Sequence, residues 1–589
     1  MTTAVPQESE RRHSKQHHGK QHRDKQWNGK TRPTSYGSIA VDEAGNDLSY
    51  VFGATIEQGA KPLREKTLGT QLRKTVEKFP TRDAIVDVYA DKELTYEEFY
   101  QLVLRMASAM HAAGYRTGDR VGIWSTNRWE WIVVQWACHH LGLILVNINP
   151  AYRQSELNYV LGKAGVKLVF AARRYKDSEY RSMLNEARKQ RGVELQDIVY
   201  FGSDVWDEWL GAEIHDLRAV TDSLDPEDPI NIQYTSGTTG FPKGATLTHN
   251  NLVNNAYFTG ELLNYDENDR IVVPVPFFHC FGMVAAVVAA VCRGAVIINP
   301  GPTFKPRESL KAVQQTGATS LYGVPTMFIN ELTEAEDHIE YGSAYDMSNL
   351  RTGIMGGSSC PSTTMRRVMD EFNMKEVAIC YGMTETSPVS FQTRADSPLD
   401  KRVSTVGQIL PHLEAKLVDE NGEVVPVGAQ GEIKVRGYNV MKKYWQHPEK
   451  TAEAIDADGF MSTGDLGEFD DEGYLMVTGR LKDMLIRGGE NIYPREVEEF
   501  VGQHPDVADV EVIGVPDDKY GEEIMAWIIM REGRKPLTTQ DIAEFADGKL
   551  SKQKIPRYVH CVKEFPMTAS GKVRKVELRE WAPKALGWI

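Results

Sequence analysis

The segment from Tyr234 to Gly244 reads YTSGTTGFPKG and combines the residue types that bind phosphate groups. Glycine allows backbone N–H groups to approach an anion closely, Ser and Thr hydroxyls add hydrogen-bond donors, and lysine adds positive charge. The segment follows the strand-like run Ile230–Tyr234. It therefore indicates a loop that wraps phosphate oxygens at the end of a buried strand. A linker or a hairpin turn of the same composition is the alternative.

The spacing within this segment differs from that of the P-loop. A P-loop lysine is followed by Ser or Thr, whereas Lys243 is followed by Gly244. The sequence therefore disfavours a P-loop kinase or ATPase.

Three further polar or glycine-rich segments also follow predicted strands. They are PFFHCFG (276–282) after Ile271–Pro274, GGSS (356–359) after Gly353–Met355, and YGMTE (381–385) after Val377–Cys380. Ligands of parallel α/β sheets bind at the carboxyl ends of the strands. We therefore expect these segments and the 234–244 segment to open onto one edge and to form one site.

Alternating strand and helix patterns would position these loops. Thr95 and Glu98 form a capping box at the start of a predicted helix. Predicted strands at Arg120–Trp124 and Leu143–Asn147 enclose a predicted helix at Trp129–Leu141. This alternation is typical of an α/β fold with a parallel sheet covered by helices, and we expect the folded body to begin near Thr67.

Residues 1–36 are predicted to be a disordered, basic, His-rich tail. They contain no leucine or isoleucine, so they cannot form a core. The histidines at 13, 17, 18 and 22 suggest metal binding, with a solvated basic tail as the alternative. The tail lacks the apolar run of a secretory signal and could contact anionic lipid.

Composition limits the class of protein. The apolar share of 41% and the charged share of 25% are those of a soluble globular chain. A net charge of −14 is unfavourable for general nucleic-acid binding, so no nucleic-acid partner is expected. The six scattered cysteines fit a reducing, cytoplasmic location. The longest apolar run, Met283–Cys292, is too short to span a bilayer.

Six motifs occur in a fixed order along the chain. They are YTSGTTGFPKG, PFFHCFG, YGMTE, STGD (462–465), GRLKDMLIRGGENIYPREVE (479–498) and PMTASGKVRK (566–575). Together they resemble the adenylate-forming (AMP-binding) superfamily over essentially all of residues 67–580. Within it, the chain is most similar to bacterial medium- or long-chain fatty acyl-CoA synthetases.

The resemblance implies a reaction in two halves, with ATP, Mg²⁺ and CoA. A carboxylate attacks the α-phosphate of ATP to give an acyl-adenylate and pyrophosphate, and the CoA thiol then displaces AMP. It also implies a large N-terminal domain of mostly parallel sheets layered with helices, at residues 37–480. A small α+β lid domain would follow at residues 481–589.

Residue by residue, the motifs imply an ATP site. The β- and γ-phosphates would be held by Thr235, Ser236, Gly237, Thr238, Thr239, Gly240 and Lys243. Thr384 would contact the α-phosphate, Glu385 would bind magnesium and Tyr381 would stack on adenine. Asp465 and Arg480 would bind the ribose, and Lys572 would neutralise charge during adenylation. By themselves, these residues also fit a helix cap, a turn, a surface ion pair and a solvated basic face.

The motifs imply acyl and CoA sites as well. His279 would gate the acid substrate, beside an apolar helix wall of Met283 and Val284 and under Gly356 and Gly357. Lys482 would be the hinge about which the lid rotates between half-reactions. Gly488 and Gly489 would leave room for the pantetheine of CoA, with a plain Gly-Gly hairpin as the alternative.

Other functions remain open at this point. An aryl-acid CoA ligase, or an enzyme that loads the acid onto a separate carrier protein, is the nearest alternative. A nucleotide-binding protein without catalysis is a distant one, because Glu385, Asp465 and Lys572 are all present. The oligomeric state and the acyl chain length are not encoded in any motif.

Overall fold

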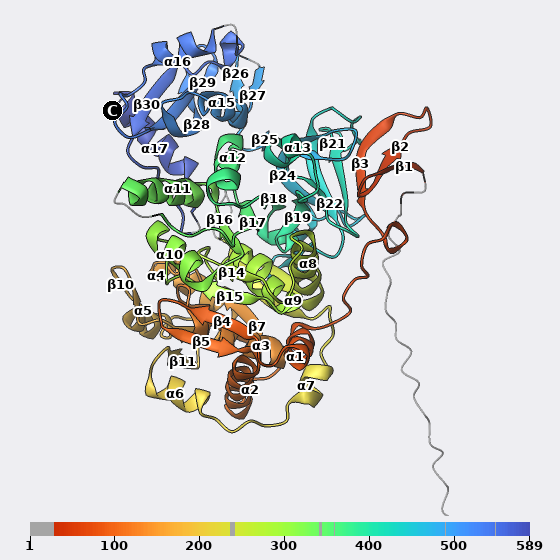
Figure 1. Ribbon diagram of the computed structural model, residues 1–589, viewed down its shortest axis with the longest axis vertical. Helices are drawn as coiled ribbons and strands as arrows, with labels where there is room; N and C mark the ends of the chain where they lie inside the picture. The colour runs from red at the N-terminus through yellow and green to blue at the C-terminus, as the bar shows by residue number, and fades with distance from the viewer. Residues whose placement is uncertain are drawn as a thin grey trace, which may run out of the picture.

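The computed structural model describes residues 27, 29–235, 242–340, 344–358, 360–488, 490–547, 549–569 and 571–588. Among the described residues, three large sheets, a two-stranded sheet of β9 (Arg174–Tyr175) and β10 (Ser178–Glu179), and their helices form the larger, N-terminal part. A separate sheet with three α-helices forms the C-terminal part, drawn in blue at the top of Figure 1. The mixed α/β fold agrees with the predicted class.

The first sheet has seven strands and carries the start of the predicted phosphate-binding segment. Its parallel strands are β6 (Arg120–Trp124), β7 (Ile144–Asn147), β8 (Val166–Ala171), β11 (Asp197–Tyr200) and β12 (Pro229–Thr235). Two antiparallel strands, β13 (Lys243–Thr248) and β23 (Lys443–Tyr444), extend it beyond β12. The predicted strand Arg120–Trp124 and the predicted helix α3 (Trp129–Leu141) are confirmed.

The second sheet has nine strands in the order β20-β19-β18-β17-β16-β14-β15-β4-β5. Its parallel strands are β4 (Asp83–Asp87), β14 (Arg270–Val272), β15 (Val296–Asn299), β16 (Ser320–Gly323), β17 (Thr352–Gly356) and β18 (Glu376–Gly382). Antiparallel strands flank them, namely β5 (Lys92–Thr95), β19 (Val389–Gln392) and β20 (Gln408–Ile409).

The expectation that four loops open onto one edge of one sheet was wrong. The strand before the phosphate-binding segment, β12, belongs to the seven-stranded sheet, whereas β14, β17 and β18 belong to the nine-stranded one. Strand patterns record where a strand occurs but not which strands pair, so two sheets of the same type look like one in sequence.

The third sheet is antiparallel throughout and was not predicted. Its order is β1 (Lys30–Thr34), β2 (Gly37–Val41), β3 (Asp47–Gly53), β21 (Glu414–Val418), β22 (Gly431–Arg436), β24 (Met461–Phe469) and β25 (Leu475–Arg480). Two segments more than three hundred residues apart in sequence, β3 and β21, thus pair directly.

Strands β1 to β3 correct two predicted boundaries. Of the predicted tail, residues 1–26 and 28 lie outside the described residues, but residues 30–34 form a strand, and the folded body begins well before Thr67. The segment KTRPT lacks large aliphatic residues, so no apolar pattern marks it. It is held by pairing with β2 and by an ion pair of 2.7 Å between Arg32 and Asp47.

The helices of the N-terminal part share one large hydrophobic core with the sheets. They include α1 (Leu68–Lys78), α2 (Tyr96–Ala112), α3, α8 (His249–Leu262) and α9 (Ala289–Arg293). The predicted capping box of α2 is confirmed. Glu98 N donates to Thr95 Oγ1 at 3.2 Å, and Thr95 N donates to Glu98 Oε2 at 2.8 Å.

The C-terminal part has its own five-stranded sheet and two small hydrophobic clusters. The strands are β26 (Leu485–Arg487), β27 (Glu490–Ile492), β28 (Val507–Asp517), β29 (Gly521–Met530) and β30 (Tyr558–Val562). The helices are α15 (Pro494–Val501), α16 (Thr539–Ala546) and α17 (Lys575–Ala585). Separate cores of this kind allow two parts of a chain to move relative to each other.

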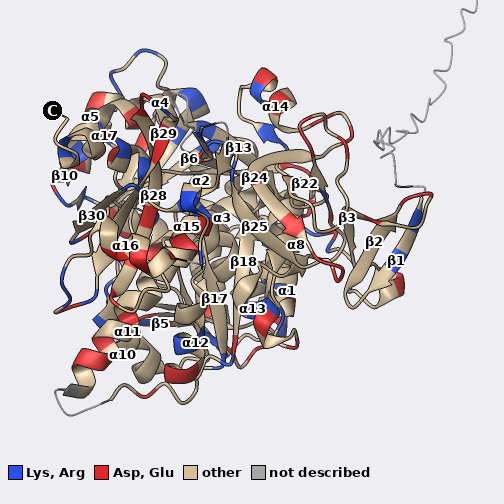
Figure 2. Ribbon diagram, turned by 90° about the horizontal axis from the view of Figure 1, so that it is seen from above, with Lys and Arg blue, Asp and Glu red and all other residues tan. Residues whose placement is uncertain are grey.

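Ion pairs cross-link the elements of the C-terminal part. In Figure 2, acidic residues are coloured red on α15, β28 and α16, and basic residues are coloured blue in the same part of the chain. Lys575, the first residue of α17, contacts Glu498 of α15 at 2.5 Å and Glu511 of β28 at 3.1 Å. The N-terminal end of α17, three residues after Lys572, is therefore fixed to the sheet.

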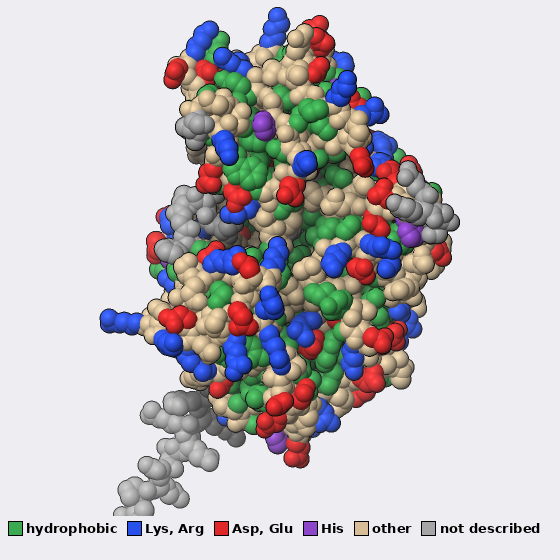
Figure 3. Space-filling model, turned by 90° about the vertical axis from the view of Figure 1, so that its left-hand side faces the viewer, with side chains coloured by type: hydrophobic (Ala, Val, Ile, Leu, Met, Phe, Trp, Pro, Cys, Tyr) green, Lys and Arg blue, Asp and Glu red, His purple; other side chains and the backbone are tan. Residues whose placement is uncertain are grey.

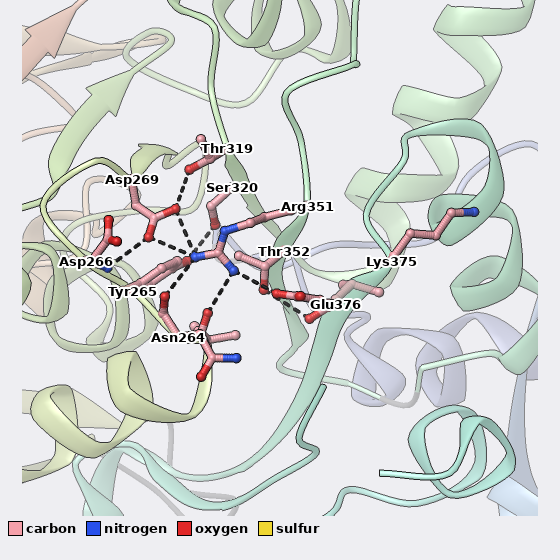
Figure 4. Close-up of polar contacts among 12 residues, drawn as sticks. Asn264, Tyr265, Asp266, Asp269, Thr319, Ser320, Arg351, Thr352, Lys375 and Glu376 are labelled. Carbon is pink, nitrogen blue, oxygen red and sulfur yellow. Dashed lines mark hydrogen bonds and ion pairs between the residues drawn. The ribbon is translucent and has the colours of Figure 1, made fainter. Parts of the chain in front are cut away.

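Arg351 fastens the amino ends of the strands in the nine-stranded sheet (Figure 4). Its guanidinium contacts Asp269, just before β14, at 2.8 Å and Glu376, at the start of β18, at 2.7 Å. Asp269 also accepts a hydrogen bond of 2.6 Å from Thr319, just before β16. The opposite, carboxyl ends of these strands carry the candidate site, so this network holds the strands that position it.

We expect Arg351→Met to lower the free energy of unfolding by about 2 kcal/mol, because the buried Asp269 carboxylate loses a charged partner. The melting temperature should fall as a result. Lys375→Met is the matched control. Lys375 points away from Arg351 in Figure 4, and its ion pair with Asp370 is exposed, so little change is expected. Thermal unfolding of both variants checks this, and equal melting temperatures would contradict it.

Candidate active site

The predicted phosphate-binding segment joins two antiparallel strands. Thr235 ends β12 and Lys243 begins β13, and the two residues are paired in register. The predicted residues Ser236, Gly237, Thr238, Thr239 and Gly240 lie outside the described residues. The structure therefore places the two ends of the segment side by side, as a hairpin would.

Glu385 lies against this hairpin. Thr384 and Glu385 belong to the short 3-10 helix η3 (Thr384–Thr386), which follows β18, and both are buried. Thr235 Oγ1 donates to Glu385 Oε1 at 3.2 Å, and the hydroxyl of Tyr444 donates to the same oxygen at 2.8 Å. Thr384 lies next to Glu385 in the same short helix, and its hydroxyl is 3.6 Å from Cys280 Sγ.

Asp465 connects the second and third sheets. It lies in β24 directly opposite Arg480 of β25, and Arg480 Nε donates to Asp465 Oδ1 at 2.7 Å. Tyr381, at the end of β18, donates its hydroxyl to Asp465 Oδ2 at 2.8 Å. The carboxylate is buried while Arg480 is largely exposed, and the attraction of Asp465 raises the pKa of Arg480. Both carboxylate oxygens are thus oriented by the protein.

Lys572 reaches the N-terminal part from the C-terminal part. Its Cε atom lies 3.6 Å from the position that a Cβ on Gly357 would take. A Cβ on the neighbouring Gly571 would lie 3.0 Å from a methyl group of Val324, which follows β16. Gly571 also has a φ of +82°, which favours glycine. Close packing at Gly571 therefore brings the lysine beside Gly357.

The electrostatic environment of Lys572 is that of the predicted ATP site. Burial, and then the nearby charge of Arg480, lower the pKa of Lys572. Asp465 and Glu385 act in the opposite direction and favour the ammonium form. The charges of Glu385 beside the hairpin, of Asp465 and Arg480 in the third sheet, and of Lys572 in the C-terminal part therefore interact with one another.

His279 precedes the π-helix η2 (Phe281–Val288). Its Nδ1 accepts a hydrogen bond of 3.2 Å from the Phe281 backbone N–H. Burial and the charge of Lys572 lower the pKa of His279 to about 3, so the ring is neutral at pH 7. A neutral imidazole adds no second positive charge near Lys572, which fits a residue that contacts the substrate.

Met283 and Val284 are fully buried in η2, as expected for an apolar wall. Asn147 donates a weak hydrogen bond of 3.4 Å to the sulfur of Met283. On the neighbouring sheet, a Cβ on Gly356 would lie 2.9 Å from Cys380 Sγ. Gly357 has a φ of +91°, so both glycines of this loop are required by its geometry.

The remaining predicted residues lie apart from this group. Lys482 is exposed in the turn between β25 and β26. Gly488 has a φ of +62° in the turn between β26 and β27, and its N–H donates to the Tyr520 carbonyl at 2.8 Å. Gly489 lies outside the described residues. Gly488 therefore faces Tyr520 within the C-terminal part, as in the hairpin alternative.

Two features of this site were not predicted from sequence. Tyr444 contacts Glu385 from a two-residue strand, and Cys380 lies beside Gly356. Neither belongs to a motif with a recognisable spacing. An isolated tyrosine or cysteine gives no sequence signal, because its role depends on strand pairing.

Comparison with known proteins identifies the family. A family model described as AMP-binding enzyme matches residues 72–445, and a second, described as AMP-binding enzyme C-terminal domain, matches residues 496–572. The first match alone spans more than half of the chain. The chain belongs to the AMP-binding enzyme family. The two matches contain the site residues from Thr235 to Glu385 and Lys572.

This AMP-binding enzyme is similar over most of its length to proteins named as acyl-CoA synthetases or ligases. It is 44% identical to YngI of Bacillus subtilis, which carries the name acyl-CoA synthetase, over 88% of this chain and 97% of that protein. It is 40% identical to the mitochondrial medium-chain acyl-CoA ligase ACSF2 of Danio rerio, over 92% of this chain and 91% of that protein.

Solved structures of two CoA ligases or synthetases share the fold. The anthranilate CoA ligase AuaEII, in complex with anthranoyl-AMP, matches with a TM-score of 0.80 and 25% identity, over 90% of this chain and 99% of that one. A fatty acyl CoA synthetase of Mycobacterium tuberculosis matches with a TM-score of 0.67 and 28% identity, over 87% and 98%. Among the described residues of our chain, no helix is long and apolar enough to cross a membrane.

The lowered pKa of Lys572 predicts a pH dependence. If the ammonium form is required, kcat/KM for ATP should fall as the pH rises through a pKa below that of an ordinary lysine. Pyrophosphate exchange measured from about pH 7 to about pH 10 checks this. Lys572→Arg should keep part of the activity and lose the fall, because a guanidinium stays protonated. A level profile in the unsubstituted enzyme would contradict the prediction.

Proposed function

We propose that the chain is an ATP-dependent fatty acid–CoA ligase that forms AMP. A carboxylic acid and ATP give an acyl-adenylate and pyrophosphate, and CoA then gives the acyl-CoA and AMP. The observation that carries this proposal is the position of Lys572, next to Gly357 and in the field of Asp465 and Glu385. The full-length similarity to acyl-CoA ligases supports it.

In the first half-reaction, two anions must approach each other. The Lys572 ammonium group would neutralise charge between the substrate carboxylate and the α-phosphate. Thr384, at the adjacent buried turn, offers a hydroxyl to the α-phosphate. Thr235 and Lys243, at the two ends of the hairpin, offer a hydroxyl and a positive charge to the phosphates that leave.

Asp465, together with Arg480 and Tyr381, would bind the nucleoside part of ATP. Its two carboxylate oxygens can accept hydrogen bonds from the two ribose hydroxyls, and Arg480 and Tyr381 hold the carboxylate in place. Because each oxygen already accepts one bond, ribose must share or replace these donors. The Tyr381 ring would stack on adenine.

The site fits a Mg²⁺ ion that binds with ATP. Among the described residues, no cluster of three His, Cys, Asp or Glu side chains could hold a metal by itself. Mg²⁺ commonly binds through one or two carboxylates together with substrate phosphates and water, and Glu385 supplies one such carboxylate beside the hairpin. When bound, the ion would offset the negative charge of the phosphates.

The acyl site favours an alkyl acid. Met283 and Val284 are buried, and η2 has no charged residue. We expect a medium- to long-chain fatty acid, and the relatives named medium-chain acyl-CoA ligase support the medium-chain part of this range. An aryl acid is the second candidate, because the structural neighbour AuaEII is named as an anthranilate CoA ligase.

The second half-reaction requires a different arrangement of the C-terminal part. We propose that residues 481–589 form a lid that rotates about Lys482, withdraws Lys572 and brings Gly488 and Gly489 to the CoA channel. The separate core of this part and its exposed connecting turn support the rotation.

The free thiols of all six cysteines support a cytoplasmic location.

Pyrophosphate exchange with a panel of carboxylic acids, followed by detection of CoA thioesters, tests the function. We expect exchange and thioester formation with medium- and long-chain fatty acids. Exchange without thioester would favour the loading of a carrier protein, and a preference for aryl acids would favour the second candidate. No exchange with any acid would favour a non-catalytic nucleotide-binding protein.

Two single substitutions separate the half-reactions. Lys572→Ala should slow adenylation by about 100- to 1,000-fold, because one charge-stabilising group is lost, and should leave thioester formation from supplied acyl-adenylate largely intact. Lys482→Pro should impair the transfer to CoA far more than adenylation, because proline restricts the backbone of the hinge. Equal losses in both half-reactions for either variant would contradict its assigned role.

A further inference from the structure

Tyr444 contacts two oppositely charged residues of the candidate ATP site. It lies in β23, paired with Ala245 of β13, and is 3% exposed. Its hydroxyl donates to Glu385 Oε1 at 2.8 Å, and Lys243 Nζ lies 4.3 Å from the centre of its ring. A single side chain therefore binds an anion at its tip and a cation on its face.

The backbone around Tyr444 makes the same connection. Met441 N donates to the Glu385 carbonyl at 2.8 Å, and Trp445 N donates to the Gly244 carbonyl at 2.7 Å. The segment 441–445 thus joins the helix η3 to the strand that begins with Lys243. Because its backbone is fixed at both ends, the Tyr444 ring has little freedom to move away from either partner.

The two donors to Glu385 meet the same oxygen. Thr235 and Tyr444 both donate to Oε1, which fixes the rotation of the carboxylate. Among the described residues, no hydrogen bond to the other oxygen, Oε2, is formed. Among the described residues, Oε2 is thus left for a further ligand, and a carboxylate oxygen is the type of atom that a hard cation prefers.

The ring also keeps Lys243 from neutralising Glu385. Opposite charges at short range attract strongly when they are shielded from water. Within the described part of the chain, Lys243 and Glu385 form no ion pair, and the Lys243 ammonium instead rests on the Tyr444 ring, a contact that attracts cations. Without the ring, the two side chains could pair with each other.

We infer that Tyr444 is a positioning residue that holds Lys243 and Glu385 apart, so that Lys243 remains available to the phosphates and Glu385 to the metal ion of MgATP. The inference rests on the proposed function and adds a residue to that site. It makes a specific distinction between the two ends of the side chain. The hydroxyl orients the Glu385 carboxylate, which would bind the metal ion. The ring holds Lys243, which would bind the phosphates.

Binding of ATP, measured by calorimetry with and without Mg²⁺ and in the absence of acid and CoA, tests this distinction. Tyr444→Phe keeps the ring and loses the hydroxyl, so we expect the Kd of MgATP to rise about 10-fold, the loss typical of a hydrogen bond to a charged group. The Kd of metal-free ATP should stay within about twofold, because Lys243 keeps its ring contact. Tyr444→Leu removes both contacts and should weaken binding in both conditions.

Tyr438→Phe is the matched control. Tyr438 is a buried tyrosine six residues earlier, and its hydroxyl has no hydrogen-bond partner among the described residues. Its removal should leave both Kd values unchanged. Melting temperatures of all variants exclude a general loss of folding.

The outcomes separate the two proposals. If the unsubstituted chain binds MgATP and exchanges pyrophosphate, but Tyr444→Phe binds as tightly as the parent or weakens equally with and without Mg²⁺, the positioning role is wrong and the proposed function stands. If the unsubstituted chain binds no MgATP, both are wrong. A selective loss of MgATP affinity in Tyr444→Phe alone supports the role of the hydroxyl.

Discussion

The site depends on one buried positive charge that comes from the C-terminal part. Removing a lysine ammonium group from water is unfavourable, and the lowered pKa of Lys572 reflects that cost. The carboxylates of Asp465 and Glu385 offset part of it, and an incoming pair of anionic substrates would offset more. In this arrangement Gly571 packs closely against Val324, and the charge that the C-terminal part delivers is stabilised best when substrates are bound.

The groups around Lys572 come from elements that no single sheet could bring together. The hairpin β12–β13 belongs to the first sheet, and Asp465 and Arg480 belong to the third. Tyr381 lies near the end of β18 of the second sheet, and Glu385 follows that strand. Polar contacts across the sheet boundaries, from Tyr381 to Asp465 and from Thr235 and Tyr444 to Glu385, set their relative positions. Each of the two carboxylates, Asp465 and Glu385, is oriented by a neutral hydroxyl from a different sheet.

Charge at the surface is distributed differently. On the face shown in Figure 3, Lys and Arg side chains lie among Asp and Glu side chains. With a net charge of −14, the chain as a whole does not attract anions, so attraction of ATP and of an acid must come from the local groups. In the proposed acyl site, the uncharged wall formed by η2 would favour apolar acids, because charged substrate tails would lose their hydration there.

The sequence by itself determined the motifs, the α/β class and the bounds of strongly patterned elements such as α3 and the capped start of α2. These depend on local patterns of apolar residues and on short-range capping, which neighbouring residues specify. Only the tertiary structure decided that the strands form two parallel sheets and that residues 30–53 join a third. It alone placed Tyr444 between Lys243 and Glu385. Strand pairing and side-chain contacts join residues up to hundreds of positions apart, and one sequence carries no local record of such partners.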